Sequence, residues 1–152
     1  MPKVGIIMGS RSDEAIMQEC ANILDQFGVE YEIRVISAHR TPEKAREYGM
    51  TARERGLQVL VAAAGGAAHL PGVLASWTSL PIIGVPLASS ELKGIDSLYS
   101  IVQMPPGIPV ATVSVGAWGA RNAAYLAAQI IALQDENVRA KYDQYRADLA
   151  QG

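Results

Sequence analysis

The chain is poor in charged residues, cysteine and aromatic residues. Charged side chains make up 18% of its 152 residues, against about 25% in a typical globular protein, and 49% of the residues are apolar. Because large apolar patches on globular proteins usually mark interfaces, we expect much of the exterior to be buried against further copies of the chain. Trp77 and Trp118 lie among small apolar residues and are interpreted as core or interface anchors.

The scarcity of cysteine, of long apolar stretches and of clustered basic residues indicates where the protein is located and which partners it does not bind. The only cysteine, Cys20, excludes an internal disulfide and favours a reducing compartment. The longest apolar stretch, Leu57 to Ala68, is too short and too rich in glycine to span a bilayer, and no signal-peptide pattern follows Lys3. The formal net charge is -2 and the basic residues are scattered. We therefore expect a cytoplasmic protein that binds neither nucleic acid nor membrane.

Five short apolar runs are present and predict strands: KVGIIM, YEIRVI, QVLVAAA, PIIGV and PVATVSV. Most are apolar throughout rather than alternating, which is typical of parallel strands with helices on both faces. With helical patterns between them, they predict an α/β fold, a three-layer α/β/α sandwich of the flavodoxin-like type with a five-stranded parallel sheet. No linker or repeat divides the chain, so residues 1–152 are predicted to form one domain, with a C-terminal helical extension from about residue 119.

Helix signals lie between the strands. Apolar spacing predicts a first helix over about 13–27 that buries Cys20 on its apolar stripe. A second helix is expected to open with Thr41 as its N-cap and Pro42 at its first position. The closing helix presents a face of small residues that is expected to include Leu133.

Polar loops follow the first three predicted strands: GSRSD, SAHRTP and GGAAHLPG. In a flavodoxin-like order these strands are neighbours, so the loops should meet at the carboxyl edge of the sheet, where such folds bind ligands. Ser10, Ser12 and Asp13 either cap the first helix or help to bind a ligand there. Since Asp13 would repel phosphate, it would hold a hydroxyl, such as those of a ribose. The loop matches neither G-x-G-x-x-G nor the P-loop, so a dinucleotide or nucleoside triphosphate is not supported.

His39 and Arg40 are the strongest candidates for chemistry. Histidine exchanges a proton near neutral pH, and arginine grips phosphate with two parallel hydrogen bonds, although an arginine at a strand end often only meets water. Gly65 and Gly66 are either turn residues or positions where backbone amides approach a small anionic group. His69 is either an interior hydrogen-bonding residue or part of the same site.

The three loops, together with GVP from Gly84 and GIDSLYSIVQMP from Gly94, resemble the N5-carboxyaminoimidazole ribonucleotide mutase family of purine biosynthesis. The similarity spans nearly the entire chain, and the last motif resembles the mutase class rather than the class that carboxylates aminoimidazole ribonucleotide directly. Pro106 departs from the family pattern. The resemblance implies a flavodoxin-like fold, a homo-octamer with active sites near subunit contacts, and no metal or organic cofactor.

The resemblance also implies an activity and assigns residues to it. The family moves a carboxylate from an exocyclic amine to a ring carbon by decarboxylation and recarboxylation, and His39 matches its general acid and base. Arg40 matches a phosphate-binding position, and Ser10 and Asp13 match positions that bind the ribonucleotide substrate. Residues in matching motifs are expected to line the same pocket: Ser37, Gly65, His69 and Leu70.

Two other functions remain open. The chain would otherwise be an aminoimidazole ribonucleotide carboxylase that uses CO2 directly, or a non-catalytic sensor of nucleotide phosphates. For the mutase, the expected metabolic neighbour is N5-carboxyaminoimidazole ribonucleotide synthetase, which would hand over the unstable carbamate transiently.

Overall fold

The computed structural model describes residues 1–152. Its elements in chain order are β1 (Val4–Met8), the 3-10 turn η1 (Arg11–Asp13), α1 (Glu14–Gln26), β2 (Tyr31–Val35), α2 (Pro42–Thr51), β3 (Val59–Gly65), α3 (Leu70–Trp77), β4 (Ile82–Leu87), α4 (Ile95–Val102), β5 (Ala111–Thr112), α5 (Ala117–Ala132) and α6 (Glu136–Ala150). The five strands form one parallel sheet in the order β2-β1-β3-β4-β5. This is the flavodoxin-like order, so the predicted fold class is confirmed.

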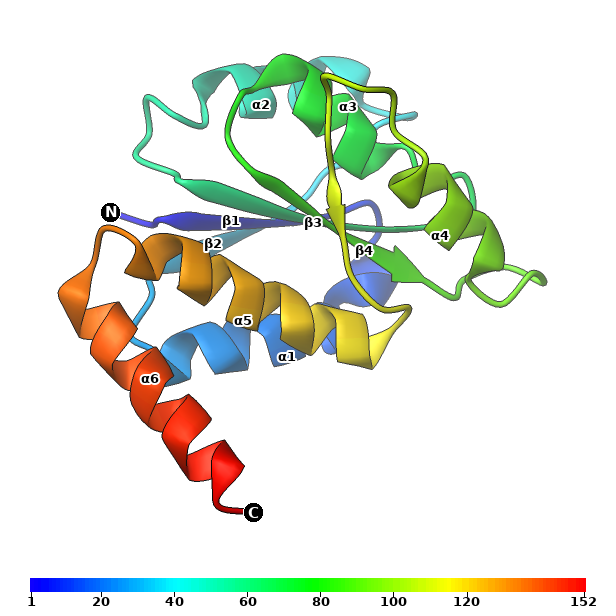
Figure 1. Cartoon of the computed structure of the whole chain (residues 1–152). Helices are drawn as coiled ribbons and strands as arrows, with labels where there is room; N and C mark the ends of the chain where they lie inside the picture. The colour runs from blue at the N-terminus through cyan, green and yellow to red at the C-terminus, as the bar shows by residue number, and fades with distance from the viewer.

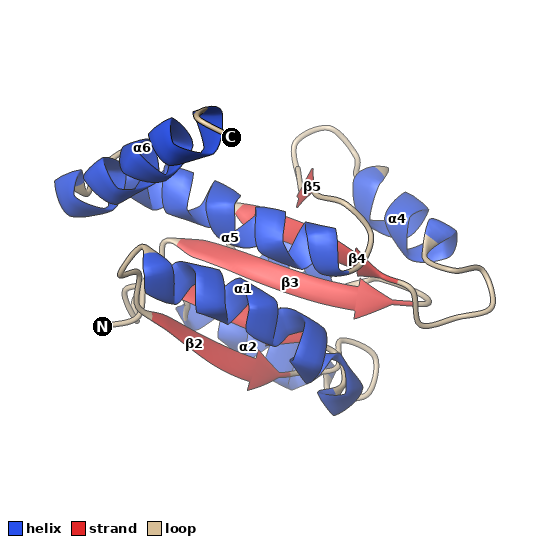
Figure 2. Cartoon of the chain, turned by 90° about the horizontal axis from the view of Figure 1, so that it is seen from below, coloured by secondary structure: helices blue, strands red, loops and turns tan.

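Helices cover both faces of the sheet. In Figure 1, α2 and α3 lie above the sheet, and α1 and α5 lie below it. Figure 2 views the molecule from below and shows α1 and α5 side by side across the face of β3. None of the helices combines the length and the apolar character needed to cross a membrane.

The sheet separates two hydrophobic cores. Along β3, Val61 packs into the core beneath α1 and α5, and its neighbour Leu60 packs into the core beneath α2 and α3. Successive side chains of a strand point to opposite faces, so a strand covered on both sides must be apolar throughout. A fully buried leucine such as Leu60 contributes about 1.5–3 kcal/mol relative to an exposed one.

Cys20 lies on the buried face of α1, as predicted from the spacing of the apolar residues. It is fully buried, and desolvation raises the pKa of its thiol to about 12. The thiol therefore stays protonated and acts as a small apolar side chain of the core.

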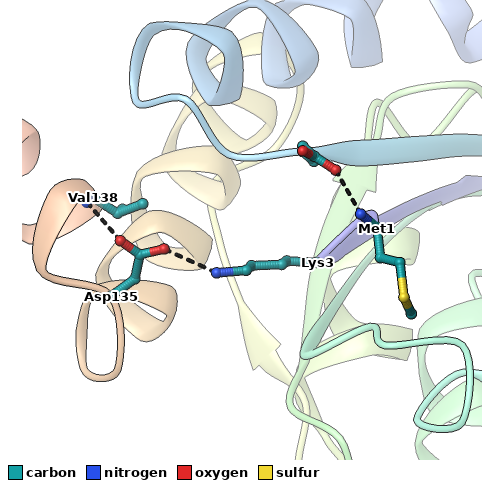
Figure 3. Close-up of polar contacts among 5 residues, drawn as sticks. Met1, Lys3, Asp135 and Val138 are labelled. Atoms are coloured by element: carbon teal, nitrogen blue, oxygen red, sulfur yellow. Dashed lines mark hydrogen bonds and ion pairs between the residues drawn. The ribbon is translucent and has the colours of Figure 1, made fainter.

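The C-terminal helix α6 extends away from the sheet and is joined to the body at two places (Figure 1). One is a cluster of aromatic rings in which Phe27 packs against Tyr125 of α5 and against Tyr142 and Tyr145 of α6. The other is an ion pair, shown in Figure 3, in which Lys3 Nζ lies 2.9 Å from Asp135 Oδ2.

Asp135 is also the N-cap of α6. Its Oδ1 accepts a hydrogen bond from the Val138 backbone N–H at 3.1 Å, as Figure 3 shows. The Lys3 ammonium and this N–H lower the pKa of the Asp135 carboxyl. One carboxylate thus starts α6 and ties it to the strand that begins the chain.

One local prediction is wrong, and two others are narrowed by the structure. Leu133 is 81% exposed, because α5 ends at Ala132 and the chain turns away toward α6. Trp118 is 74% exposed at the start of α5, so of its two predicted roles the core anchor is excluded and the interface anchor stays a prediction. Thr41 occupies the N-cap position of α2 and Pro42 its first position, as predicted, but the Thr41 hydroxyl donates to the Ser37 carbonyl at 2.8 Å and makes no capping hydrogen bond.

Candidate active site

Four loops at the carboxyl edge of the sheet enclose one cavity of about 400 Å³. They follow β1, β2, β3 and β4, and the volume lies in the range of small-molecule sites. The cavity is lined by Gly9, Ser10, Ser12, Asp13, Ser37, Ala38, His39, Arg40, Ala64, Gly65, Ala67, Leu70 and Ser89. The structure thus brings together every residue assigned to the site from the sequence except His69, which lies beside the cavity.

The loop after β1 supplies hydroxyls and a carboxylate. Ser10 is the N-cap of η1, where its Oγ accepts from the Ser12 N–H at 3.3 Å and lies 2.9 Å from the Ser12 hydroxyl. Asp13 occupies the N-cap position of α1 but makes no capping hydrogen bond, and burial raises its pKa. Helix capping therefore explains the presence of Ser10 but not that of Asp13. The Asp13 carboxylate makes no cap and lines the cavity.

The loop after β2 is held by Ser37. Its Oγ accepts from the Arg40 N–H at 3.1 Å, and its carbonyl oxygen accepts from the Thr41 N–H at 2.9 Å. These bonds fix the backbone on either side of Arg40. The Arg40 guanidinium itself is exposed and forms no ion pair with a carboxylate of the chain. It is free to bind an anionic ligand.

The rings of His39 and His69 are in contact. His39 Nε2 lies 2.5 Å from His69 Nδ1, and the ring planes meet edge to face at 81°. One of these nitrogens must carry the hydrogen and the other must be bare. The two residues follow β2 and β3, which β1 separates in the sheet, so the contact bridges non-neighbouring strands.

The two glycines at the carboxyl end of β3 have different roles. Gly66 has a φ of +57°, a left-handed conformation suited to glycine in a turn. At Gly65 an added Cβ would lie 1.7 Å from Ser89 Oγ, so glycine is required for the loops after β3 and β4 to approach each other. The turn alternative thus applies to Gly66, and the close packing at Gly65 is against Ser89.

Ser89 is the cavity residue that sequence reasoning missed. It lies just beyond the carboxyl end of β4, the neighbour of β3 in the sheet. The strand order alone could have pointed to it, because the loop after β4 should reach the same edge as the three loops before it.

Comparisons with known proteins agree with this geometry. The family model described as AIR carboxylase matches residues 3–152. The chain belongs to the AIR carboxylase family. Within this family, a relative from Pyrococcus abyssi named N5-carboxyaminoimidazole ribonucleotide mutase is 59% identical, covering 98% of this chain and 84% of the relative. A relative of the same name from Vibrio vulnificus is 60% identical, covering 96% of this chain and 91% of the relative.

A solved structure shows the same fold in this family. The crystal structure of Treponema denticola PurE has a TM-score of 0.85 and 35% sequence identity to the chain. The match covers 99% of this chain and 93% of that one.

Proposed function

We propose that the chain is an isomerase, a mutase of de novo purine (IMP) biosynthesis. It converts N5-carboxyaminoimidazole ribonucleotide to 4-carboxyaminoimidazole ribonucleotide. Relatives 54–60% identical to the chain carry the mutase name, including one from Bacillus subtilis that is 57% identical. The observation that carries the proposal is the cavity itself. It is lined by His39 and Arg40 from the loop after β2 and by Asp13 from the loop after β1.

The polar wall of the cavity suits a ribose phosphate. Arg40 binds the phosphate, because its guanidinium has no partner in the chain and its backbone is fixed by Ser37. Asp13 accepts hydrogen bonds from ribose hydroxyls, and Ser10 contributes a hydroxyl beside it. These assignments put the phosphate and sugar at the loops after β1 and β2 and direct the imidazole toward His39.

The reaction needs one proton delivered and one removed. Protonated His39 donates to the exocyclic nitrogen as its bond to the carboxyl carbon breaks, the electron pair stays on nitrogen, and CO2 is released in the cavity. The ring carbon C4 then attacks CO2 and forms the new carbon–carbon bond. Neutral His39 removes the proton from C4 and returns to its starting state, so one residue serves both steps.

The remaining site residues keep this chemistry contained. His69 holds the His39 ring through the 2.5 Å contact between their nitrogens. Gly65 and Leu70 belong to a wall of small and apolar residues, against which bound substrate would displace water from around the released CO2. Water held there would let CO2 be hydrated or escape.

Direct carboxylation of aminoimidazole ribonucleotide is the second candidate, because the matching family model is described as AIR carboxylase. One experiment separates the two. Purified protein is given the carbamate substrate, or aminoimidazole ribonucleotide with excess bicarbonate, and the initial rates are compared. We expect the carbamate to be converted much faster; equal rates would end the mutase proposal. A nucleotide-phosphate sensor would bind ligand and turn over neither substrate.

We further propose that residues 1–152 act as one catalytic domain within a cytoplasmic homo-octamer. The octamer is supported by large apolar side chains left exposed on α4, on α5 and just after it: Tyr99, Trp118 and Leu133. Light scattering should give eight times the 16.2 kDa of one chain. A transient hand-over from N5-carboxyaminoimidazole ribonucleotide synthetase would protect the unstable carbamate. It would appear as slower loss of carbamate in a coupled assay than in two separated steps.

A further inference from the structure

We propose that the Ser89 hydroxyl binds the migrating carboxylate, a role that rests on the proposed mutase function. The cavity has two chemically different walls. The loops after β1 and β2 supply its charged and most of its polar side chains, and the segment from the end of β3 to the start of α3 supplies Ala64, Gly65, Ala67 and Leu70. Ser89, from the loop after β4, is the one side-chain hydroxyl that belongs with this second, mainly apolar wall.

The position of the reacting group follows from this division. A ribose phosphate held by Arg40 and Asp13 occupies the charged wall. His39 comes from that side, but its ring reaches His69, which starts α3 immediately after the loop that follows β3. The proton donor therefore lies where the two walls meet. The carboxylate that this donor helps to release must then lie toward the second wall.

The structure holds the Ser89 hydroxyl against that wall. An added Cβ at Gly65 would come within 1.7 Å of Ser89 Oγ and 2.8 Å of Ser89 Cβ, so the absence of a side chain at residue 65 is what admits the serine. The adjacent Ser90 has a different task. Its Oγ donates to Asp96 Oδ2 at 2.7 Å and accepts from the Leu92 N–H at 3.2 Å, which organises the start of α4.

A neutral hydroxyl suits a group that alternates between carboxylate and CO2. It donates a hydrogen bond to a carboxylate oxygen without adding charge to the wall. A lysine or arginine in the same place would stabilise the charged carbamate more than neutral CO2 and would slow its release. Ser89 thus holds the oxygen atoms while the carbon moves from nitrogen to C4, and takes no part in proton transfer.

The test follows the fate of the carboxylate carbon. The carbamate substrate is labelled with 13C in its carboxylate and converted in unlabelled bicarbonate, and the label in the product is measured by mass spectrometry. We expect the wild-type protein to retain the label. Ser89→Ala should lower kcat about tenfold, the loss expected for one hydrogen bond, and should release labelled CO2 so that the product contains unlabelled carbon.

Ser90→Ala is the matched control, because it removes a hydroxyl from the same loop without touching the cavity. We expect it to lower the melting temperature and to keep the label. Equal label loss in the two variants, or full retention and unchanged kcat in Ser89→Ala, would overturn the role of Ser89. Failure of the wild-type protein to convert the carbamate would instead overturn the mutase function, so the two outcomes are distinct.

Discussion

His39 and His69 are 30 residues apart in the chain, yet 2.5 Å separates Nε2 of the first ring from Nδ1 of the second. The contact fixes the orientation of the one histidine that lines the cavity and leaves its other nitrogen, Nδ1, free of any hydrogen bond within the chain. In the proposed mechanism His39 is the reacting group and His69 its support, and substitution of each residue can test this division.

We expect His39→Asn to lower kcat by about 10²- to 10⁴-fold, the usual contribution of a general acid or base. Binding of the carboxylated product, followed by calorimetry, should change little, because asparagine is similar in size and still forms hydrogen bonds. His69→Asn should cost only about tenfold in kcat, since it weakens one hydrogen bond and leaves the acid in place. Equal losses in the two variants would contradict the division between reacting and supporting ring.

Arg40→Met should raise the KM for the ribonucleotide about 10- to 100-fold, because charge-assisted hydrogen bonds to the phosphate are lost. The matched control is Lys44→Met, which removes the same charge from a residue that lines a different cavity. A nucleoside analogue without the phosphate provides the sharper comparison, since Arg40→Met should not weaken its binding. A similar loss with both ligands would show that Arg40 supports the fold of the loop instead of the phosphate.

Asp13→Asn should stabilise the protein at neutral pH while weakening the binding of substrate. Burial raises the pKa of Asp13 above its ordinary value of 3.8, so the folded chain disfavours the charged carboxylate. That cost is present in full above the raised pKa and disappears as the pH falls below 3.8. We therefore expect the variant to melt about 2 °C higher at pH 7 and no higher at pH 3, as measured by calorimetry. A lower melting temperature at pH 7 would show that the carboxylate stabilises the fold.

Asp135→Ala should destabilise α6 more than either Asp135→Asn or Lys3→Met. Alanine removes both the cap on the Val138 N–H and the ion pair, whereas asparagine keeps a cap and Lys3→Met removes the ion pair alone. The pKa of Asp135 is lowered, so its stabilising effect is present above 3.8 and is lost as the pH falls through the lowered value. Proteolysis of α6 at pH 7 and pH 3 measures this, and equal cleavage of all variants at pH 7 would contradict it.

The main architecture was predictable from the sequence for a simple reason. A strand covered on both faces must be apolar at every position, so β1, β3 and β4 were visible as uninterrupted runs. The largest error concerns the run PVATVSV, which forms only the two-residue edge strand β5. The length of β5 is set by its pairing with β4, which covers only Ala111 and Thr112, and not by the apolar content of the run.

The candidate site was predictable only in part. Loops after parallel strands must reach the same edge of a sheet, so the sequence predicts that His39, Arg40 and Asp13 lie together, and all three line the cavity. The contact between His39 and His69 depends on how far the loops after β2 and β3 bend over the end of β1. No local sequence pattern predicts the path of these loops. The sequence around Ser89, LASS, is typical of an ordinary loop and gives no sign of a site. Ser89 reaches the cavity because Gly65 has no side chain, and that contact is visible only in the structure.

The burial of Cys20 makes the chain a convenient host for site-specific probes. Its thiol is fully buried, its pKa is raised to about 12, and it is the only cysteine in the sequence, so a maleimide reagent at neutral pH should leave it unmodified. A cysteine introduced at exposed Leu149, near the end of α6, would then be the single labelled position. In the proposed octamer, spin labels placed there would report the distances between the C-terminal helices of neighbouring copies.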